Sequence, residues 1–144
     1  MIKGVIVTNL KVIDTFGGDV MHVMKESSIG YSRFGEAYFS KVNKGVIKAW
    51  KRHKEMTLNI VVPVGKIKFI LFDDREVSNI QFQEVVISRN KYCRLTIPPM
   101  VWVGFQGSSN SDSMLLNIAN RVHDPSEIDR LDIDKINYDW SVDL

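Results

Sequence analysis

Apolar and polar positions alternate in short runs along most of the chain, and turn-forming residues separate these runs. Residues 66–72 begin with period-two alternation and end apolar, as a strand does when its later half is buried on both faces. Branched and aromatic residues predict further strands at residues 1–12, 20–24, 34–42, 46–52, 58–62, 82–87, 92–97, 101–105 and 114–119. No segment before residue 124 sustains helical periodicity. We therefore expect an all-β sandwich or barrel.

Turn residues mark the boundaries of this pattern. Glycines within residues 14–19 and the Pro63-Val64-Gly65 segment predict turns. After Pro125, residues 126–131 are compatible with one short helical turn, with Ser126 as its cap. No internal repeat is visible, so we expect a single domain over residues 1–144.

The composition narrows the class of protein. A chain of 144 residues with a net charge of +2 can bury a sizeable core and has no nucleic-acid signature in its overall charge. No apolar run reaches the length of a membrane span. The apolar run at the N-terminus is too short for a secretory signal, so we expect a cytoplasmic location. Cys93 is the single cysteine, which excludes an intramolecular disulfide and a cysteine metal cluster, and we expect it to be buried.

Basic residues gather in one short segment. Residues 41–54 contain Lys41, Lys44, Lys48, Lys51, Arg52, His53 and Lys54. Such a cluster is either a solvated face or the binding site of an anionic ligand, and the sequence leaves both interpretations open.

Two segments, one bounded by glycines and one that begins with proline, resemble the two sequence motifs of the cupin barrel. Gly45 is followed by five residues, then by Lys51-Arg52-His53, and Gly65 closes the segment; Pro98 begins the second motif. Of the four ligand positions in cupins, only His53 keeps a metal-binding side chain. A transition metal needs three or four converging donors, so we expect no metal at this position and exclude a metal-dependent cupin oxygenase.

The whole chain more closely resembles the short relatives of dTDP-4-dehydrorhamnose 3,5-epimerase. The resemblance is carried by residues 18–25, 45–54, 71–76, 97–99 with 104–105, and 137–140. It implies a cupin-type jelly roll, a homodimer whose N-terminal strands can cross between subunits, and no metal or organic cofactor. It also implies an enzyme of surface polysaccharide biosynthesis that acts on a nucleotide-linked 4-keto-6-deoxy sugar and does not bind nucleic acid or membranes.

In that family a histidine base removes the proton beside the ketone and a tyrosine can return one on the opposite face. Lys51 stands at the position of the base, and Lys48 matches the position that contacts phosphate. The expected tyrosine would fall near residues 116–117, where the chain has none. Strand alternation predicts that Lys51 and His53 share one face, with Lys48 on the other. We therefore expect Lys51 and His53 to be the acid-base residues and Lys48 to bind phosphate.

Other candidates are less directly supported by the motifs. Trp102 is a candidate for stacking on the nucleobase or sugar, with a core position as the alternative. Arg121 is a candidate for an anionic ligand, or for an ion pair with Asp124 or Glu127. Residues 138–140 are expected to dock the C-terminal tail on the barrel. Two functions remain open: an epimerase, or a non-catalytic sugar-nucleotide-binding or scaffolding relative that has lost the base and acid.

Overall fold

The computed structural model describes residues 1–141, and strands dominate it. The strands are β1 (Ile6–Asn9), β2 (Val12–Thr15), β3 (Gly18–Met21), β4 (Glu36–Val42), β5 (Ile47–His53), β6 (Leu58–Val64), β7 (Lys66–Asp73), β8 (Gln81–Ser88), β9 (Cys93–Ile97), β10 (Trp102–Gly107), β11 (Ser113–Ala119) and β12 (Ile128–Arg130). Two short 3₁₀ helices follow β11, η1 (Pro125–Glu127) and η2 (Ile133–Lys135). Within the described residues, no helix has the length and apolar character needed to cross a bilayer.

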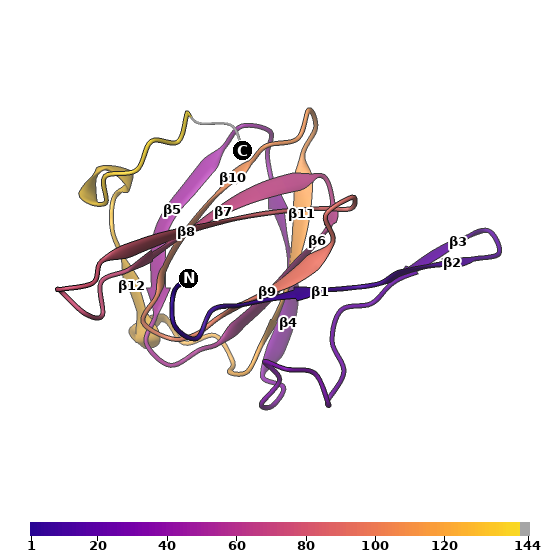
Figure 1. The fold of residues 1–144 in the computed structure, drawn as a ribbon, viewed down its shortest axis with the longest axis horizontal. Coiled ribbons are helices and arrows are strands. Elements are labelled where there is room, and N and C mark those ends of the chain that lie inside the picture. Colours follow the sequence, from indigo (N-terminus) through magenta and orange to yellow (C-terminus); the bar gives the residue numbers. More distant parts are fainter. Residues whose placement is uncertain (142–144) are drawn as a thin grey trace.

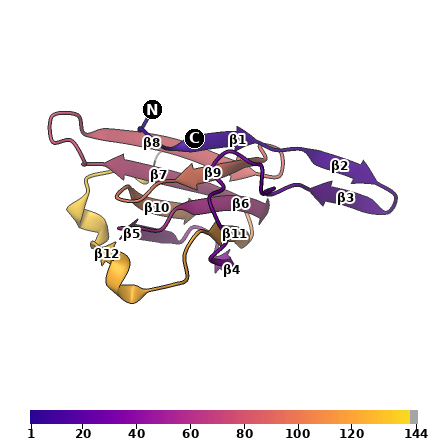
Figure 2. The same cartoon turned by 90° about the horizontal axis from the view of Figure 1, so that it is seen from below.

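The strands form two five-stranded antiparallel sheets that face each other. The first sheet has the order β1-β9-β6-β11-β4 and the second the order β12-β5-β10-β7-β8. The hairpin β2–β3 projects away from the sheets in both views (Figure 1 and Figure 2), and in Figure 2 the strands of each sheet follow one another from top to bottom, from β8 to β12 and from β1 to β4. The all-β prediction is confirmed, and the facing sheets have the jelly-roll arrangement that the resemblance implied.

Most strands lie where alternation predicts them, but the C-terminal segment differs. Asp124, not Ser126, caps η1: its side chain accepts the backbone N–H of Ser126 at 2.9 Å. The predicted helical turn at residues 126–131 is wrong beyond Glu127, because Ile128 to Arg130 pair with the edge of β5. Pairing with a distant strand here overrides the local preference for a turn.

The main core lies between the two sheets. Inward-facing residues of both sheets fill it, including Leu58, Phe69, Leu71, Leu95 and Val103. Cys93 belongs to this core, as expected.

A second apolar cluster covers the outer face of the second sheet. Ile70 belongs to it although its neighbours in sequence belong to the main core, because successive side chains of a strand point to opposite faces. Ile136, Tyr138 and Trp140 pack on this face together with Trp50, and the Trp50 and Trp140 ring centroids are 5.4 Å apart. The expected docking of the C-terminal segment is therefore confirmed for its described residues.

Candidate functional site

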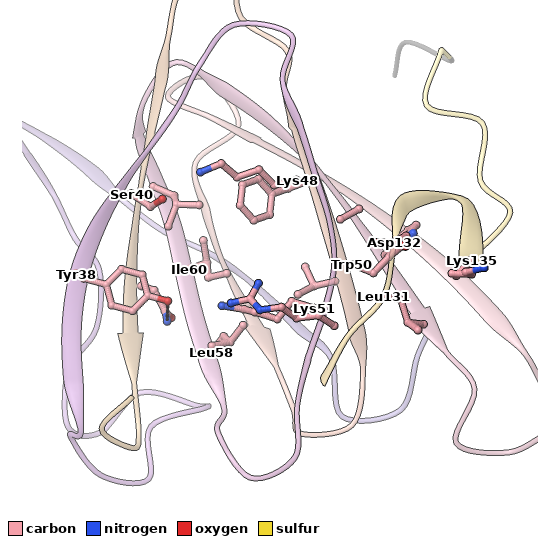
Figure 3. A pocket seen from close by; sticks show the side chains of 16 residues that line it. Tyr38, Ser40, Lys48, Trp50, Lys51, Leu58, Ile60, Leu131, Asp132 and Lys135 are labelled. Carbon is pink, nitrogen blue, oxygen red and sulfur yellow. Dashed lines mark hydrogen bonds between the residues drawn. The ribbon is translucent and has the colours of Figure 1, made fainter. Parts of the chain in front are cut away.

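A cavity of about 690 Å³ opens between the two sheets. Its apolar floor comes from Leu58, Ile60, Val103, Phe105 and Leu115. The polar and charged side chains stand around this floor, as Figure 3 shows for those it labels. They are Tyr38, Ser40, Lys48, Lys51, Asn117, Arg130, Asp132 and Lys135. The cavity thus combines an apolar surface with a few converging polar groups, as small-molecule sites do.

Lys48 and Lys51 both line this cavity, which corrects the expectation that they face opposite ways. In the pairing of β5 with β10, Lys51 stands opposite Val103 and Lys48 stands opposite Phe105, and the register shifts between these pairs. Three steps along β5 therefore match two steps along β10. This bulge adds one residue to β5 and turns Lys48 back to the face of Lys51.

Cationic side chains dominate the rim. Among residues 1–141, the cavity is lined by Lys48, Lys51, Arg130 and Lys135 and by one carboxylate, Asp132. Arg130 pairs in register with Lys51 across β12 and β5, so two like charges stand side by side. Such an arrangement favours an anionic ligand, which would relieve their repulsion.

Lys51 is the cavity residue with the most perturbed ionisation. Burial lowers the pKa of Lys51, and the neighbouring Arg130 lowers it further, while Glu127 and Glu36 oppose the shift. No hydrogen bond or ion pair holds its ammonium group within residues 1–141. Both causes favour the neutral amine, which is the form that can accept a proton.

His53 does not line the cavity. Its side chain is 4% exposed, and its Nδ1–H donates to the carboxylate of Glu127. Glu127 also accepts the backbone N–H groups of Glu55 at 3.0 Å and Met56 at 3.3 Å. Burial lowers the pKa of His53, although the hydrogen bond to Glu127 opposes this. His53 therefore joins β5 to η1 and, unlike Lys51, does not face the cavity.

Trp102 and Arg121 lie elsewhere in the fold. Trp102 is adjacent to Val103 on β10, so it faces the outer side of the sheet and belongs to the second apolar cluster. The Arg52 guanidinium lies 4.4 Å from the Trp102 ring centroid. Arg121 pairs with Glu55 at 2.7 Å, and not with either acid expected from the sequence. Of the residues expected at the site, the structure brings Lys48 and Lys51 together in the cavity.

Tyr38 is a cavity residue that sequence reasoning missed. It stands on β4 directly opposite Asn117 on β11, and Asn117 Nδ2 donates to Tyr38 Oη at 3.1 Å. The expected tyrosine falls near residue 117, so the phenol comes from the neighbouring strand at the same level of the sheet. Strand pairing is the signal that would have found it. Arg130 was missed because residues 126–131 were expected to form a helical turn, whereas Arg130 pairs with Lys51 in the sheet. Lys135 was not among the residues expected at the site.

The donors needed for a metal site are not assembled. Among residues 1–141, no group of three His, Cys, Asp or Glu side chains is placed so that it could hold a metal ion. His53 has Glu127 as its neighbour, and the cavity itself contains cations around one carboxylate. The cavity lining includes the amine of Lys51, the phenol of Tyr38 and the amide of Asn117.

Comparison with known proteins identifies the family. The chain is 30% identical over 115 residues to the probable low-salt glycan biosynthesis epimerase Agl13 of Haloferax volcanii, a match that covers 75% of this chain and 74% of that protein. The chain belongs to the family of dTDP-4-dehydrorhamnose 3,5-epimerase and related dTDP-sugar isomerases. No protein-family profile matches it.

Solved structures of this epimerase-like family superpose over nearly the whole chain. A dTDP sugar isomerase from Desulfovibrio desulfuricans G20 is 36% identical, with a TM-score of 0.92, and the match covers 99% of this chain and 94% of that one. The 3,4-ketoisomerase QdtA from Thermoanaerobacterium thermosaccharolyticum was solved as a mutant with TDP-4-keto-6-deoxyglucose. It is 19% identical to this chain with a TM-score of 0.75, and the match covers 91% of this chain and 90% of QdtA. The second likeness establishes the shared fold alone.

Proposed function

We propose that this protein is a sugar-nucleotide epimerase that acts on a dTDP-linked 4-keto-6-deoxy sugar, moving a proton at a carbon beside the ketone. The observation that carries this proposal is the half-buried amine of Lys51, which has no hydrogen-bond or ion-pair partner among residues 1–141 and lines a cavity with three further cations. The names of its relatives, a glycan biosynthesis epimerase and a dTDP sugar isomerase, support a dTDP-linked sugar as substrate and a role in glycan biosynthesis; within that role we propose surface polysaccharide biosynthesis.

The reaction needs a base that is unprotonated when the substrate binds. A ketone acidifies the neighbouring C–H group, and the neutral Lys51 amine accepts that proton. Burial and Arg130 both lower the pKa of Lys51 and so favour the neutral form. The resulting enolate is negatively charged, and cations beside it stabilise that charge more strongly in an apolar cavity than in water. Arg130 has the position for this role because it is the register partner of Lys51.

The diphosphate of the substrate needs a separate set of contacts. Lys48 and Lys135 line the same cavity as Lys51, and Lys48 is exposed at the position expected for the phosphate contact. We assign both to the diphosphate, with no metal or organic cofactor in the reaction. His53 has no place in substrate contact in this scheme, since its ring is enclosed with Glu127.

We also infer a cytoplasmic homodimer. The hairpin β2–β3 projects from the sheets, its tip residue Phe16 is fully exposed, and Ile13 and Val20 are more than 40% exposed on its strands. Apolar side chains on a projecting arm favour a contact with a second copy. Light scattering after size-exclusion chromatography should give a mass near twice 16.5 kDa, and Phe16→Asp should shift it toward the monomer; a monomeric wild-type protein would contradict this inference.

The test of the proposed function is solvent exchange at the sugar. The protein is incubated with dTDP-4-keto-6-deoxyglucose in deuterated water, and deuterium at the carbons beside the ketone is followed by mass spectrometry against a protein-free control. Lys51→Ala should lower the exchange rate about 100-fold or more, the size expected for loss of a general base. Lys41→Ala is the matched control, because Lys41 pairs with Asp112 on the surface, at 2.8 Å.

The same experiment separates the two functions left open by the sequence. Exchange that depends on Lys51 supports the enzyme. Saturable binding of the nucleotide sugar without any exchange would instead support the non-catalytic binding relative, and it would contradict the proposed reaction for this sugar.

A further inference from the structure

The amide of Asn117 has its orientation fixed by the sheet. Its Oδ1 accepts the backbone N–H of Asn59 at 3.1 Å, inside the buried centre of the first sheet. The Nδ2 group is therefore the end that meets Tyr38, and it donates to Tyr38 Oη at 3.1 Å. Asn117 itself is 1% exposed, so this orientation is held on all sides by packed neighbours.

This fixed amide determines where the phenol hydrogen can go. Because Tyr38 Oη accepts a hydrogen bond from Asn117, its own O–H must point to another acceptor. No residue of the described chain accepts from Tyr38. Tyr38 lines the cavity, so its O–H is available to a molecule bound there.

Tyr38 and Lys51 approach the cavity from opposite walls. Tyr38 belongs to β4 in the first sheet and Lys51 to β5 in the second. Figure 3 shows their side chains entering the cavity from different sides. A sugar ring bound between the sheets would present one face to the amine and the other to the phenol.

We propose that Tyr38 is the general acid of this site and that Asn117 is the positioning residue that directs its hydroxyl toward the substrate. This inference rests on the proposed function, since it needs Lys51 to remove a proton beside a ketone. Neutral Lys51 takes the proton from carbon and leaves an enolate. Tyr38 then donates its proton to the same carbon from the opposite face, which restores the ketone with that carbon inverted.

The charges balance at the end of this step. Lys51 is left as an ammonium and Tyr38 as a phenolate that still accepts the N–H of Asn117, and transfer of one proton between them through solvent resets both. Delivery to the opposite face inverts a carbon centre and leaves the ketone where it was. The arrangement therefore predicts an epimerase and not an enzyme that moves the ketone along the ring.

The test separates proton removal from inversion. With dTDP-4-keto-6-deoxyglucose in deuterated water, Tyr38→Phe should still exchange the C–H proton through Lys51, whereas formation of the epimer, followed by NMR, should fall about 100-fold. Tyr138→Phe is the control, because its hydroxyl donates to Glu84 outside the cavity. Circular dichroism checks that each variant is folded.

Two variants at position 117 probe the positioning role. In Asn117→Asp the carboxylate can only accept, so it should draw the Tyr38 O–H away from the cavity; we expect kcat for inversion to fall at least tenfold with little change in KM. The double variant Tyr38→Phe/Asn117→Tyr should regain inversion, because positions 38 and 117 are cross-strand partners.

The possible failures are distinguishable. If the wild-type protein exchanges the proton and Tyr38→Phe inverts the carbon at the wild-type rate, the assignment of Tyr38 is overturned and the proposed function stands. If the wild-type protein binds the sugar without exchange, both fail together. A product with the ketone moved along the ring would also overturn the assignment, since that product does not need a proton on the opposite face.

Discussion

Replacing Glu127 tests the buried hydrogen bond between His53 and Glu127, which connects β5 to the C-terminal segment that lines the cavity. The Glu127 side chain is 5% exposed, and it accepts from His53 Nδ1 and from the backbone N–H groups of Glu55 and Met56. Immediately after Glu127, β12 carries Arg130 into the cavity. Loss of the carboxylate should therefore affect both stability and the position of this cation.

The size of the effect follows from the groups left without partners. Glu127→Ala strands the buried His53 Nδ1–H and the N–H of Met56, and each buried unsatisfied group costs about 1–3 kcal/mol. We expect a loss of about 2–6 kcal/mol in the free energy of unfolding, the sum for two such groups. In Glu127→Gln the side-chain oxygen can still accept the backbone N–H groups of Glu55 and Met56. The side-chain NH₂ can donate to His53 Nδ1 if the imidazole hydrogen moves from Nδ1 to Nε2. Since Nε2 has no partner within residues 1–141, this variant should lose about 1–3 kcal/mol.

Denaturant unfolding, followed by tryptophan fluorescence, measures both losses. Glu55→Ala is the matched control: Glu55 pairs with Arg121 with more than half of its side chain exposed, so its removal should cost at most about 1 kcal/mol. The reasoning is refuted if Glu127→Ala is no less stable than Glu55→Ala, or if the Gln variant loses as much as the Ala variant.

The same pair predicts a response to acid. Burial lowers the pKa of His53; burial alone would raise that of Glu127, but its hydrogen bonds from His53 and the backbone lower it. The unfolded chain therefore binds more protons than the folded one, and stability should decrease as the pH falls below about 6.5, and again below roughly 4.5. Glu127→Gln should show a smaller second decrease in pH-dependent unfolding, because carboxylates such as Asp73, whose pKa is also lowered, still contribute to it.

Three further predictions concern the motif glycines and the cavity cations. Gly45 and Gly65 both have positive φ, +74° and +82°, but a Cβ at Gly45 meets nothing within 4 Å whereas one at Gly65 collides with Ser113. Thermal unfolding should therefore show a loss of about 1–2 kcal/mol for Gly45→Ala and a larger loss, by at least about 1 kcal/mol of overpacking, for Gly65→Ala. The kcat/KM for exchange should rise with pH through a pKa below the ordinary value for lysine, because the base must be the neutral Lys51 amine; a flat profile would contradict this role. Lys48→Ala should weaken dTDP binding about tenfold, or about 1.4 kcal/mol, in calorimetry at low salt, because Lys48 is assigned to the diphosphate; an unchanged Kd would exclude Lys48 from that site.

The strands could be predicted because their signal is local. Alternation within β7 and the branched residues of β6 and β11 need only a few neighbours to be interpreted, and these strands begin and end within two residues of the prediction. The cap of η1 was also within reach of sequence reasoning. Asp124 stands directly before Pro125, and proline at the first helical position after an acidic cap is a known start signal.

The faces of β5 could not be predicted in the same way. Alternation assumes one residue per step, but the bulge against β10 adds a residue between Lys48 and Lys51. That bulge depends on pairing with a strand about fifty residues later in the chain, so the sequence of β5 alone does not predict it. The position of His53 outside the cavity could not be predicted for a similar reason, since its partner Glu127 is 74 residues away.

The missing tyrosine shows why such long-range pairing matters for function. Judged by position alone, Asn117 indicates the loss of an acid, and together with Lys51 in place of the histidine it left open a protein without catalysis. In the sheet, Asn117 and Tyr38 are 79 residues apart in sequence and hydrogen-bonded across β11 and β4. Cross-strand side chains lie close enough to reach the same point in a cavity. A tyrosine on either of two paired strands can therefore place its phenol at the same site. The absence of a tyrosine from one motif position is weak evidence that the chemistry has been lost.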